Sequence, residues 1–108
     1  MVFHINSPAG GGPVIYSDVL GLSAGIWYHF ALVRDGNIWR FYKNGEPVGA
    51  STQSVTIPDA ACPLTIGRGE GTGGFEGLID EVRIYNRVLL AEEIKEHYRG
   101  GMRRTQIQ

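Results

Sequence analysis

The central part of the chain, residues 26–50, predicts three antiparallel strands and constrains the fold more than any other stretch. It reads IWYHFALVRDGNIWRFYKNGEPVGA. Residues 27–34 are rich in aromatic and aliphatic side chains, which favour strands. Asp35-Gly36-Asn37 predicts a first turn, and Asn44-Gly45 is typical of a two-residue hairpin turn with positive φ at both central positions. We therefore expect a meander with strands over 27–34, 38–43 and 46–50.

The first of these strands is apolar on both faces. Side chains alternate along a strand, which gives one face Trp27, His29, Ala31 and Val33 and the other face Tyr28, Phe30, Leu32 and Arg34. This pattern indicates a strand near the middle of a sheet that is covered on both sides. We expect His29 to be a packed, hydrogen-bonded core histidine and Trp39 to pack in the core.

The remaining chain predicts short strands and one helix. Further strands are expected over 2–5, 14–16, 53–57, 64–66 and 78–86. Residues 91–99 predict a short helix with Ile94 and Tyr98 on its packing face, ended by Gly100-Gly101. We expect residues 1–101 to form a single domain and residues 102–108 to be a frayed polar tail.

Three sequence blocks occur in an order that resembles laminin-G-like domains, members of the concanavalin A-like lectin/glucanase superfamily. They are WYHFALVRDG (27–36) with FYKNGE (41–46), LTIGR (64–68) with FEGLIDEVRIYNR (75–87), and Leu89 with AEEI (91–94). The resemblance covers roughly residues 25–98. It implies an all-β antiparallel sandwich of the jelly-roll type with one short C-terminal helix. It also implies an extracellular or cell-surface setting.

Two features depart from the family pattern. Leu90 stands where the family usually has a Ser or Thr that caps the helix; losing such a cap costs about 1 kcal/mol, and we expect burial of Leu90 to compensate. The chain is also short, because the family sandwich usually has more strands before Trp27. Either this is a minimal sandwich, or a homodimer or a swap of N-terminal strands supplies the missing half.

Charge and composition argue against several classes of partner. The formal net charge is −1, so nothing in the overall charge predicts binding to nucleic acid or to a membrane surface. No apolar run approaches the roughly 20 residues that span a bilayer, and the first residues lack the features of a signal peptide. Cys62 is the only cysteine, which excludes an intramolecular disulfide.

The carboxylates predict a protein without catalytic activity. Glycosidases of the superfamily carry an E-x-D-x-x-E string, which is absent here, and Glu76, Asp80 and Glu81 have a different spacing. A glycosidase needs two carboxyl groups about 5–9.5 Å apart across one sugar bond. Residues 69–74 match G-x-G-x-x-G, but a predicted strand follows them where a dinucleotide site requires a helix. We interpret them as a connecting loop.

Asp80 is the candidate metal ligand. On the predicted 78–86 strand it shares a face with Leu78 and Val82, and a carboxylate among apolar neighbours must be paired, hydrogen-bonded or bound to metal. One interpretation is a calcium ion, which the resemblance to other superfamily members also suggests. The alternative is that Asp80 accepts hydrogen bonds from backbone N–H groups of the preceding loop.

Two regions supply candidate ligand-binding residues. Arg40 and Tyr42 share a face of the 38–43 strand, and Arg68, Glu70 and Thr72 belong to a glycine-rich loop of the kind that often carries binding residues. Together with the resemblance, they favour a recognition module for carbohydrate or a glycoconjugate. The alternative is a structural module that associates with itself or with another protein.

Overall fold

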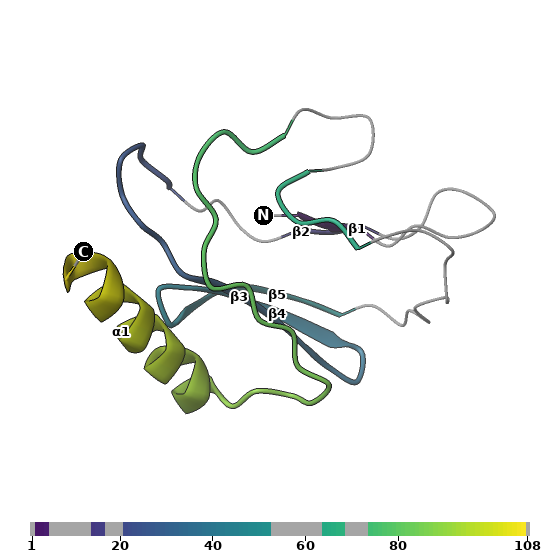
Figure 1. Ribbon diagram of the computed structural model, residues 1–108. Coiled ribbons are helices and arrows are strands. Elements are labelled where there is room, and N and C mark those ends of the chain that lie inside the picture. The colour runs from purple at the N-terminus through teal and green to yellow at the C-terminus, as the bar shows by residue number, and fades with distance from the viewer. Residues whose placement is uncertain (1, 5–13, 17–20, 53–63, 69–73, 108) are drawn as a thin grey trace.

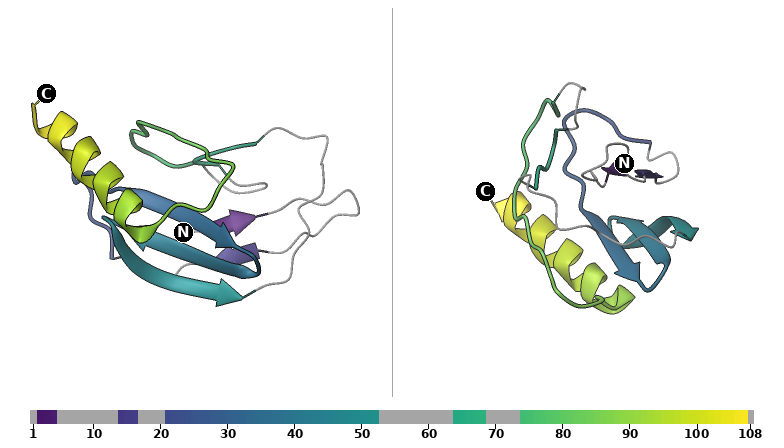
Figure 2. Two further views of the ribbon diagram at one scale, coloured as in Figure 1. Left: turned by 90° about the horizontal axis from the view of Figure 1, so that it is seen from below. Right: turned by 90° about the vertical axis from the view of Figure 1, so that its right-hand side faces the viewer.

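The computed structural model describes residues 2–4, 14–16, 21–52, 64–68 and 74–107 (Figure 1). The elements are β1 (Val2–His4), β2 (Val14–Tyr16), β3 (Phe30–Asp35), β4 (Ile38–Lys43), β5 (Glu46–Thr52) and α1 (Ala91–Ile107). Antiparallel pairing joins β1 to β2 in one sheet and β3-β4-β5 in another. The helix lies diagonally across the three-stranded sheet (Figure 2).

Two tight turns build the meander as the sequence predicts. Asp35 pairs with Ile38 across the first turn, where Gly36 has a φ of 60°. Asn44 and Gly45 have φ values of 51° and 78° in the second turn, so the positive φ expected at both positions is confirmed. The register of β4 and β5 shifts between Phe41 and Tyr42. Pro47 pairs next to that shift, on the outer strand, where a missing N–H is tolerated.

The three-stranded sheet is covered on both faces. Trp39 and Phe41 form a cluster on one face, with Leu32 and Val48 packed against them. Val33, Tyr42 and Ile94 form the cluster on the other face, together with Ala31 and Leu89. Ile94 is fully buried, and burying such a side chain stabilises a fold by about 1.5–3 kcal/mol. Trp39 packs in the core as predicted, and both faces of the sheet carry a packed cluster. Within the described sheet β3 is an end strand that pairs with β4 alone, so the expectation that it lies near the middle of a sheet was wrong.

The helix is longer than the sequence predicts. It continues through Gly100 and Gly101 to Ile107, so the expected end at Arg99 was wrong, and residues 102–107 are helical where a frayed tail was expected. A glycine inside a helix costs only about 1 kcal/mol relative to alanine, and residues 102–107 include good helix formers. Gly101 also lies close to Glu81, since a Cβ on it would be 3.1 Å from the Glu81 Oε2.

Residues 64–66 and 78–86 do not form the expected strands. Within the described residues, 64–68 and 74–88 contain one isolated bridge, between Arg68 and Gly74. The backbone of Glu81 is left-handed, with a φ of 52°, which interrupts the extended conformation that a strand requires. Residues 27–29 also precede β3 and do not belong to it, and the expected 53–57 strand lies outside the described residues. The predicted antiparallel β-structure and the helix are present, while a second large sheet is not part of what the structure describes.

We expect Gly45→Ala to lower the free energy of unfolding more than Gly36→Ala. Both glycines have positive φ, which costs an L-residue roughly 1–2 kcal/mol. A Cβ on Gly45 would also lie 3.1 Å from Lys95 Cγ in α1, whereas a Cβ on Gly36 meets nothing within 4 Å. Urea unfolding of both variants measures the difference. Equal losses would contradict close packing of α1 on this turn.

Candidate functional site

The start of α1 is capped by Glu93 instead of by the residue that precedes the helix. The backbone N–H of Leu90 donates to Glu93 Oε1 at 3.1 Å, and Ile94 N–H donates to the Leu90 carbonyl at 3.1 Å. This is half of a capping box, and Leu89 packs against the cluster that contains Ile94, which is the arrangement of a hydrophobic staple. Leu90 itself is exposed, so the expectation that its burial replaces the missing cap was wrong.

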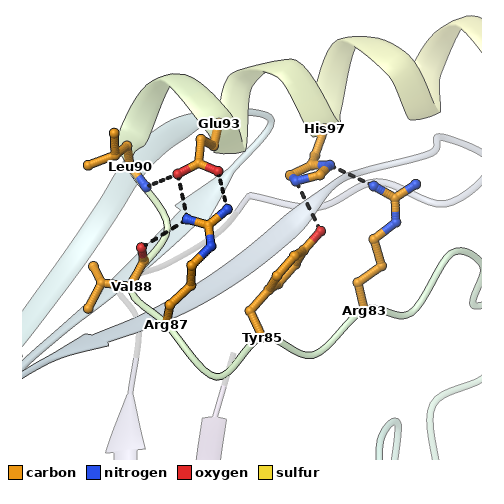
Figure 3. Close-up of polar contacts among 7 residues, drawn as sticks. All are labelled: Arg83, Tyr85, Arg87, Val88, Leu90, Glu93 and His97. Atoms are coloured by element: carbon orange, nitrogen blue, oxygen red, sulfur yellow. Dashed lines mark hydrogen bonds and ion pairs between the residues drawn. The ribbon is translucent and has the colours of Figure 1, made fainter.

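Arg87 joins the preceding segment to this capped end. Its guanidinium binds Glu93 in a bidentate manner, with Nη1–Oε1 at 2.8 Å and Nη2–Oε2 at 2.5 Å (Figure 3). Such paired charge-assisted bonds also fix the orientation of both groups. The hydrogen bonds from Arg87 and then from the Leu90 backbone lower the pKa of Glu93 to about 2. Glu93 therefore acts both as the helix cap and as the counter-ion of Arg87.

His97, one helical turn further on, binds two more residues of the same segment. Arg83 Nη1 lies 2.6 Å from His97 Nδ1, and Tyr85 Oη lies 3.1 Å from His97 Nε2 (Figure 3). Because arginine only donates, Nδ1 is the acceptor, and the ring proton of a neutral His97 is on Nε2, from which it donates to Tyr85. Residues 83, 85 and 87 thus all point towards α1.

The alternate residues of the segment present an apolar surface to solvent. Leu78, Val82 and Ile84 are 76%, 54% and 71% exposed. Further large exposed hydrophobic side chains occur nearby in the sequence, at Leu64, Ile66, Phe75 and Ile79. We call Leu78, Val82 and Ile84 the apolar edge.

Asp80 lies within the same segment and is exposed, so the expectation that it is enclosed by apolar neighbours was wrong. Its Oδ1 accepts a hydrogen bond from the backbone N–H of Glu81 at 2.8 Å, the following residue and not the preceding loop. The described residues contain no group of three or more His, Cys, Asp or Glu side chains that could hold a metal ion. A calcium ion at Asp80 stays a prediction.

The predicted ligand-binding residues differ in exposure and do not gather at one site in the described part of the chain. Tyr42 is 6% exposed and packs with Val33 and Ile94 beneath α1, so it is not on an open sheet face. Arg40 is partly exposed, and its Nη1 lies 3.6 Å from Asp35 Oδ2. Arg68 is exposed in the loop that its bridge to Gly74 closes. Glu70 and Thr72 lie outside the described residues.

His29 connects the meander to the helix. Its backbone N–H donates to Asn44 Oδ1 at 2.9 Å, and its carbonyl accepts from Asn44 N–H at 2.8 Å. The ring centroid lies 6.2 Å from that of Tyr98, and among the described residues its buried Nδ1 makes no hydrogen bond. Burial lowers the pKa of His29, and the nearby His97 and Arg83 lower it further. His29 is half-buried against Tyr98 and belongs to neither core cluster. Its backbone forms the hydrogen bonds to Asn44, so the expectation of a core histidine with a hydrogen-bonded ring was wrong at Nδ1.

The attachment of residues 83–87 to α1 was not predicted from the sequence. Its signal was present, because Arg83, Tyr85 and Arg87 alternate along the segment, while Glu93 and His97 are four residues apart and share a helix face. We predicted a buried strand over residues 78–86 because the residues that alternate with this polar set are mostly apolar. The polar set, and not the apolar one, faces the neighbouring element.

Comparison with known proteins finds a family model, a curated relative and a solved structure that resemble this chain. A laminin-G family model, described as the concanavalin A-like lectin/glucanases superfamily, matches residues 2–95. An adhesion G-protein coupled receptor V1 from Danio rerio is 31% identical over 74 residues, which is 65% of this chain and 1% of the receptor. The crystal structure of an S-layer domain-containing protein from Clostridium thermocellum matches with a TM-score of 0.65 and 28% identity, over 82% of this chain and 46% of that one.

We expect the contribution of Glu93 to stability to disappear only in strong acid. Its folded-state pKa of about 2 lies below the ordinary value of 4.5, so the contribution is complete above pH 4.5 and is lost as the pH falls towards 2. His29 already lowers stability as the pH falls below its ordinary pKa of 6.5. The measurement is therefore the difference in unfolding free energy between wild type and Glu93→Gln, recorded from pH 7 to 2.

The control is Glu92→Gln on the same helical turn. Within the described residues Glu92 makes no ion pair, so this variant should stay close to wild type across the same pH range. A Glu93→Gln difference that declines between pH 7 and 5 would contradict the role given to Arg87.

Proposed function

The chain belongs to the laminin-G-like family of the concanavalin A-like lectin/glucanases superfamily, and we propose that it is a non-catalytic association module that pairs with further copies of itself. Domains of this family are generally binding modules and occur in extracellular or cell-surface proteins. We place this chain in the same setting. No helix in the described part of the chain has the length and hydropathy to cross a bilayer.

The observation that carries this proposal is the apolar edge. Leu78, Val82 and Ile84 remain exposed although Arg83, Tyr85 and Arg87 of the same segment bind α1. The chain spans 46% of the solved S-layer chain that it resembles. Association with another copy would cover the edge and complete a sandwich.

Carbohydrate binding is the second candidate, and one group of aromatic residues favours it. Tyr28 and Phe30 stack with ring centroids 6.3 Å apart, and Lys43 Nζ lies 5.5 Å from the centre of the Tyr28 ring. Phe30 is exposed at the start of β3, and the half-buried Tyr28 lies just before that strand. In this proposal the two rings form the surface against which a sugar stacks. Arg68, with Glu70 and Thr72, would then contribute polar contacts from the loop. The burial of Tyr42 counts against a sugar site on β4.

We expect light scattering to show a dimer that dissociates on dilution through the micromolar range. Val82→Asp with Ile84→Asp should shift the protein to monomer, because two carboxylates would have to be desolvated in the contact. The control is Ile26→Asp, at a position that is 58% exposed and lies outside the apolar edge. A wild-type protein that is still monomeric at about 100 μM, where a dimer with a micromolar dissociation constant would be mostly associated, would contradict self-association.

A glycan array separates the second candidate from the first. If the chain binds carbohydrate, Phe30→Ala or Arg68→Ala should weaken binding at least severalfold without changing the melting temperature, since both side chains are exposed. If it is an association module alone, we expect no glycan to bind above background. Equal binding by wild type and both variants would contradict both of these sites.

A further inference from the structure

We propose that His97 is a proton-sensitive latch, which holds Arg83 against α1 while its imidazole is neutral and releases Arg83 when the imidazole gains a proton. The latch acts at one point of the segment 83–87 and leaves the attachment at Arg87 in place. This inference concerns the attachment itself, so it does not depend on whether the chain associates with itself or binds carbohydrate.

The latch is the hydrogen bond between Arg83 and His97. Arg83 Nη1 lies 2.6 Å from His97 Nδ1 (Figure 3). A guanidinium has donors and no acceptor, so this bond needs a lone pair on Nδ1. A neutral imidazole with its proton on Nε2 provides that lone pair, whereas a protonated imidazole carries a hydrogen on both nitrogens. Protonation therefore places two donors and two positive charges against each other.

Tyr85 stays attached in both states. Its Oη lies 3.1 Å from His97 Nε2, and this nitrogen carries a hydrogen whether the ring is neutral in this tautomer or protonated. The centroids of the two rings lie 5.7 Å apart, with 40° between the ring planes. A cationic imidazole beside an aromatic ring gains cation–π attraction. The release is therefore confined to Arg83.

Arg87 is the fixed end of the segment. It forms two hydrogen bonds to the Glu93 carboxylate, and its guanidinium carbon lies 5.8 Å from the centre of the Tyr85 ring. The pKa of Glu93 in the folded protein is about 2, so this carboxylate stays ionised over the range of about pH 5–8 in which histidine side chains change charge. One end of the segment responds to protons in that range, and the other end does not.

The charged groups around His97 come from three parts of the chain. The preceding segment contributes Arg83, and the residues before β3 contribute His29, whose pKa is lowered by both His97 and Arg83. Glu81 acts on His29 in the opposite direction. The helix contributes Glu93, whose pKa is lowered by a positive His97. Among these groups Arg83 is the one whose hydrogen bond to a His97 ring nitrogen a proton would remove.

Release of Arg83 changes the surface that this part of the chain presents. Arg83 lies between Val82 and Ile84, two exposed residues of the apolar edge. With the latch closed, the guanidinium is directed to α1 and these two neighbours are held beside it. With the latch open, residues 82–84 lose this attachment, and the guanidinium is free to move. A proton on His97 therefore alters both the order and the charge of this face.

A double-mutant cycle at two pH values tests the latch. Arg83→Ala, His97→Ala and the double variant are unfolded in urea at pH 8 and at pH 5, and the coupling is the part of the effect that the single changes do not explain. All four proteins keep His29, so its own titration cancels to first order. We expect a favourable coupling of about twofold or more in the unfolding equilibrium constant at pH 8. It should be absent or unfavourable at pH 5, because the contact is made while the imidazole is neutral and is lost as the pH falls.

The pair of Arg87 and Glu93 provides the matched control. A cycle built from Arg87→Ala and Glu93→Gln should give the same favourable coupling at pH 8 and at pH 5, because Glu93 stays ionised over that range. An equal loss of coupling at both pairs would show that acid loosens the whole helix contact, and it would overturn a latch at His97.

Nuclear magnetic resonance gives a second readout that needs no substitution. At pH 8 the ring nitrogen shifts of His97 should identify Nδ1 as the unprotonated acceptor and Nε2 as the protonated nitrogen. The heteronuclear NOE of the backbone amides of residues 82–84, which reports fast local motion, should fall between pH 8 and pH 5 while that of Arg87 stays constant. A proton on Nδ1 at pH 8, or an unchanged coupling between Arg83 and His97 at the two pH values, would overturn the proposal. Light scattering and the glycan array test the proposed function separately.

Discussion

The close approach of α1 to the turn between β4 and β5 is the constraint on which the rest of the described structure depends. Glycine is favoured at position 45 for two reasons: its φ is positive, and a Cβ there would lie 3.1 Å from Lys95 Cγ, so Lys95 would have to shift. The same turn holds His29 through the backbone and side chain of Asn44. With the helix seated there, Ile94 reaches Val33 and Tyr42 and closes one face of the sheet.

A second face of α1 contacts the segment that precedes the helix. Glu93 and His97 bind alternate residues of the segment that leads into it, so one element positions both the sheet and the segment 83–87. The individual contacts are exposed, and exposed ion pairs contribute little stability each. Their main effect is geometric: they direct the polar residues inwards to the helix and leave Val82 and Ile84 facing solvent.

The local structure of the meander could be predicted from the sequence, and the role of the later segment could not. Asn44-Gly45, the alternation in 27–34 and the packing of Trp39 depend on neighbours in the chain, so a pattern reveals them. The prediction of a strand over residues 78–86 was wrong because a strand needs a partner strand, and alternation in the sequence does not show whether a partner is present. Tyr42 was predicted as a ligand-binding residue on an open sheet face because the sequence does not show which face of β4 is covered. In the structure α1 covers the face that carries Tyr42. The predicted end of the helix before Gly100 was wrong because a glycine weakens a helix but does not by itself end it.

The order of the elements has a consequence for how the chain folds during synthesis. The meander of β3, β4 and β5 is continuous in sequence, so its contacts are local and form quickly. The side chains that cover Val33 and Tyr42 come from residues 89 and 94, which leave the ribosome after the whole meander has emerged. A nascent chain would therefore carry a formed sheet with one bare apolar face until residues 89–94 have also emerged. That interval is when the sheet is open to chaperones or to neighbouring chains.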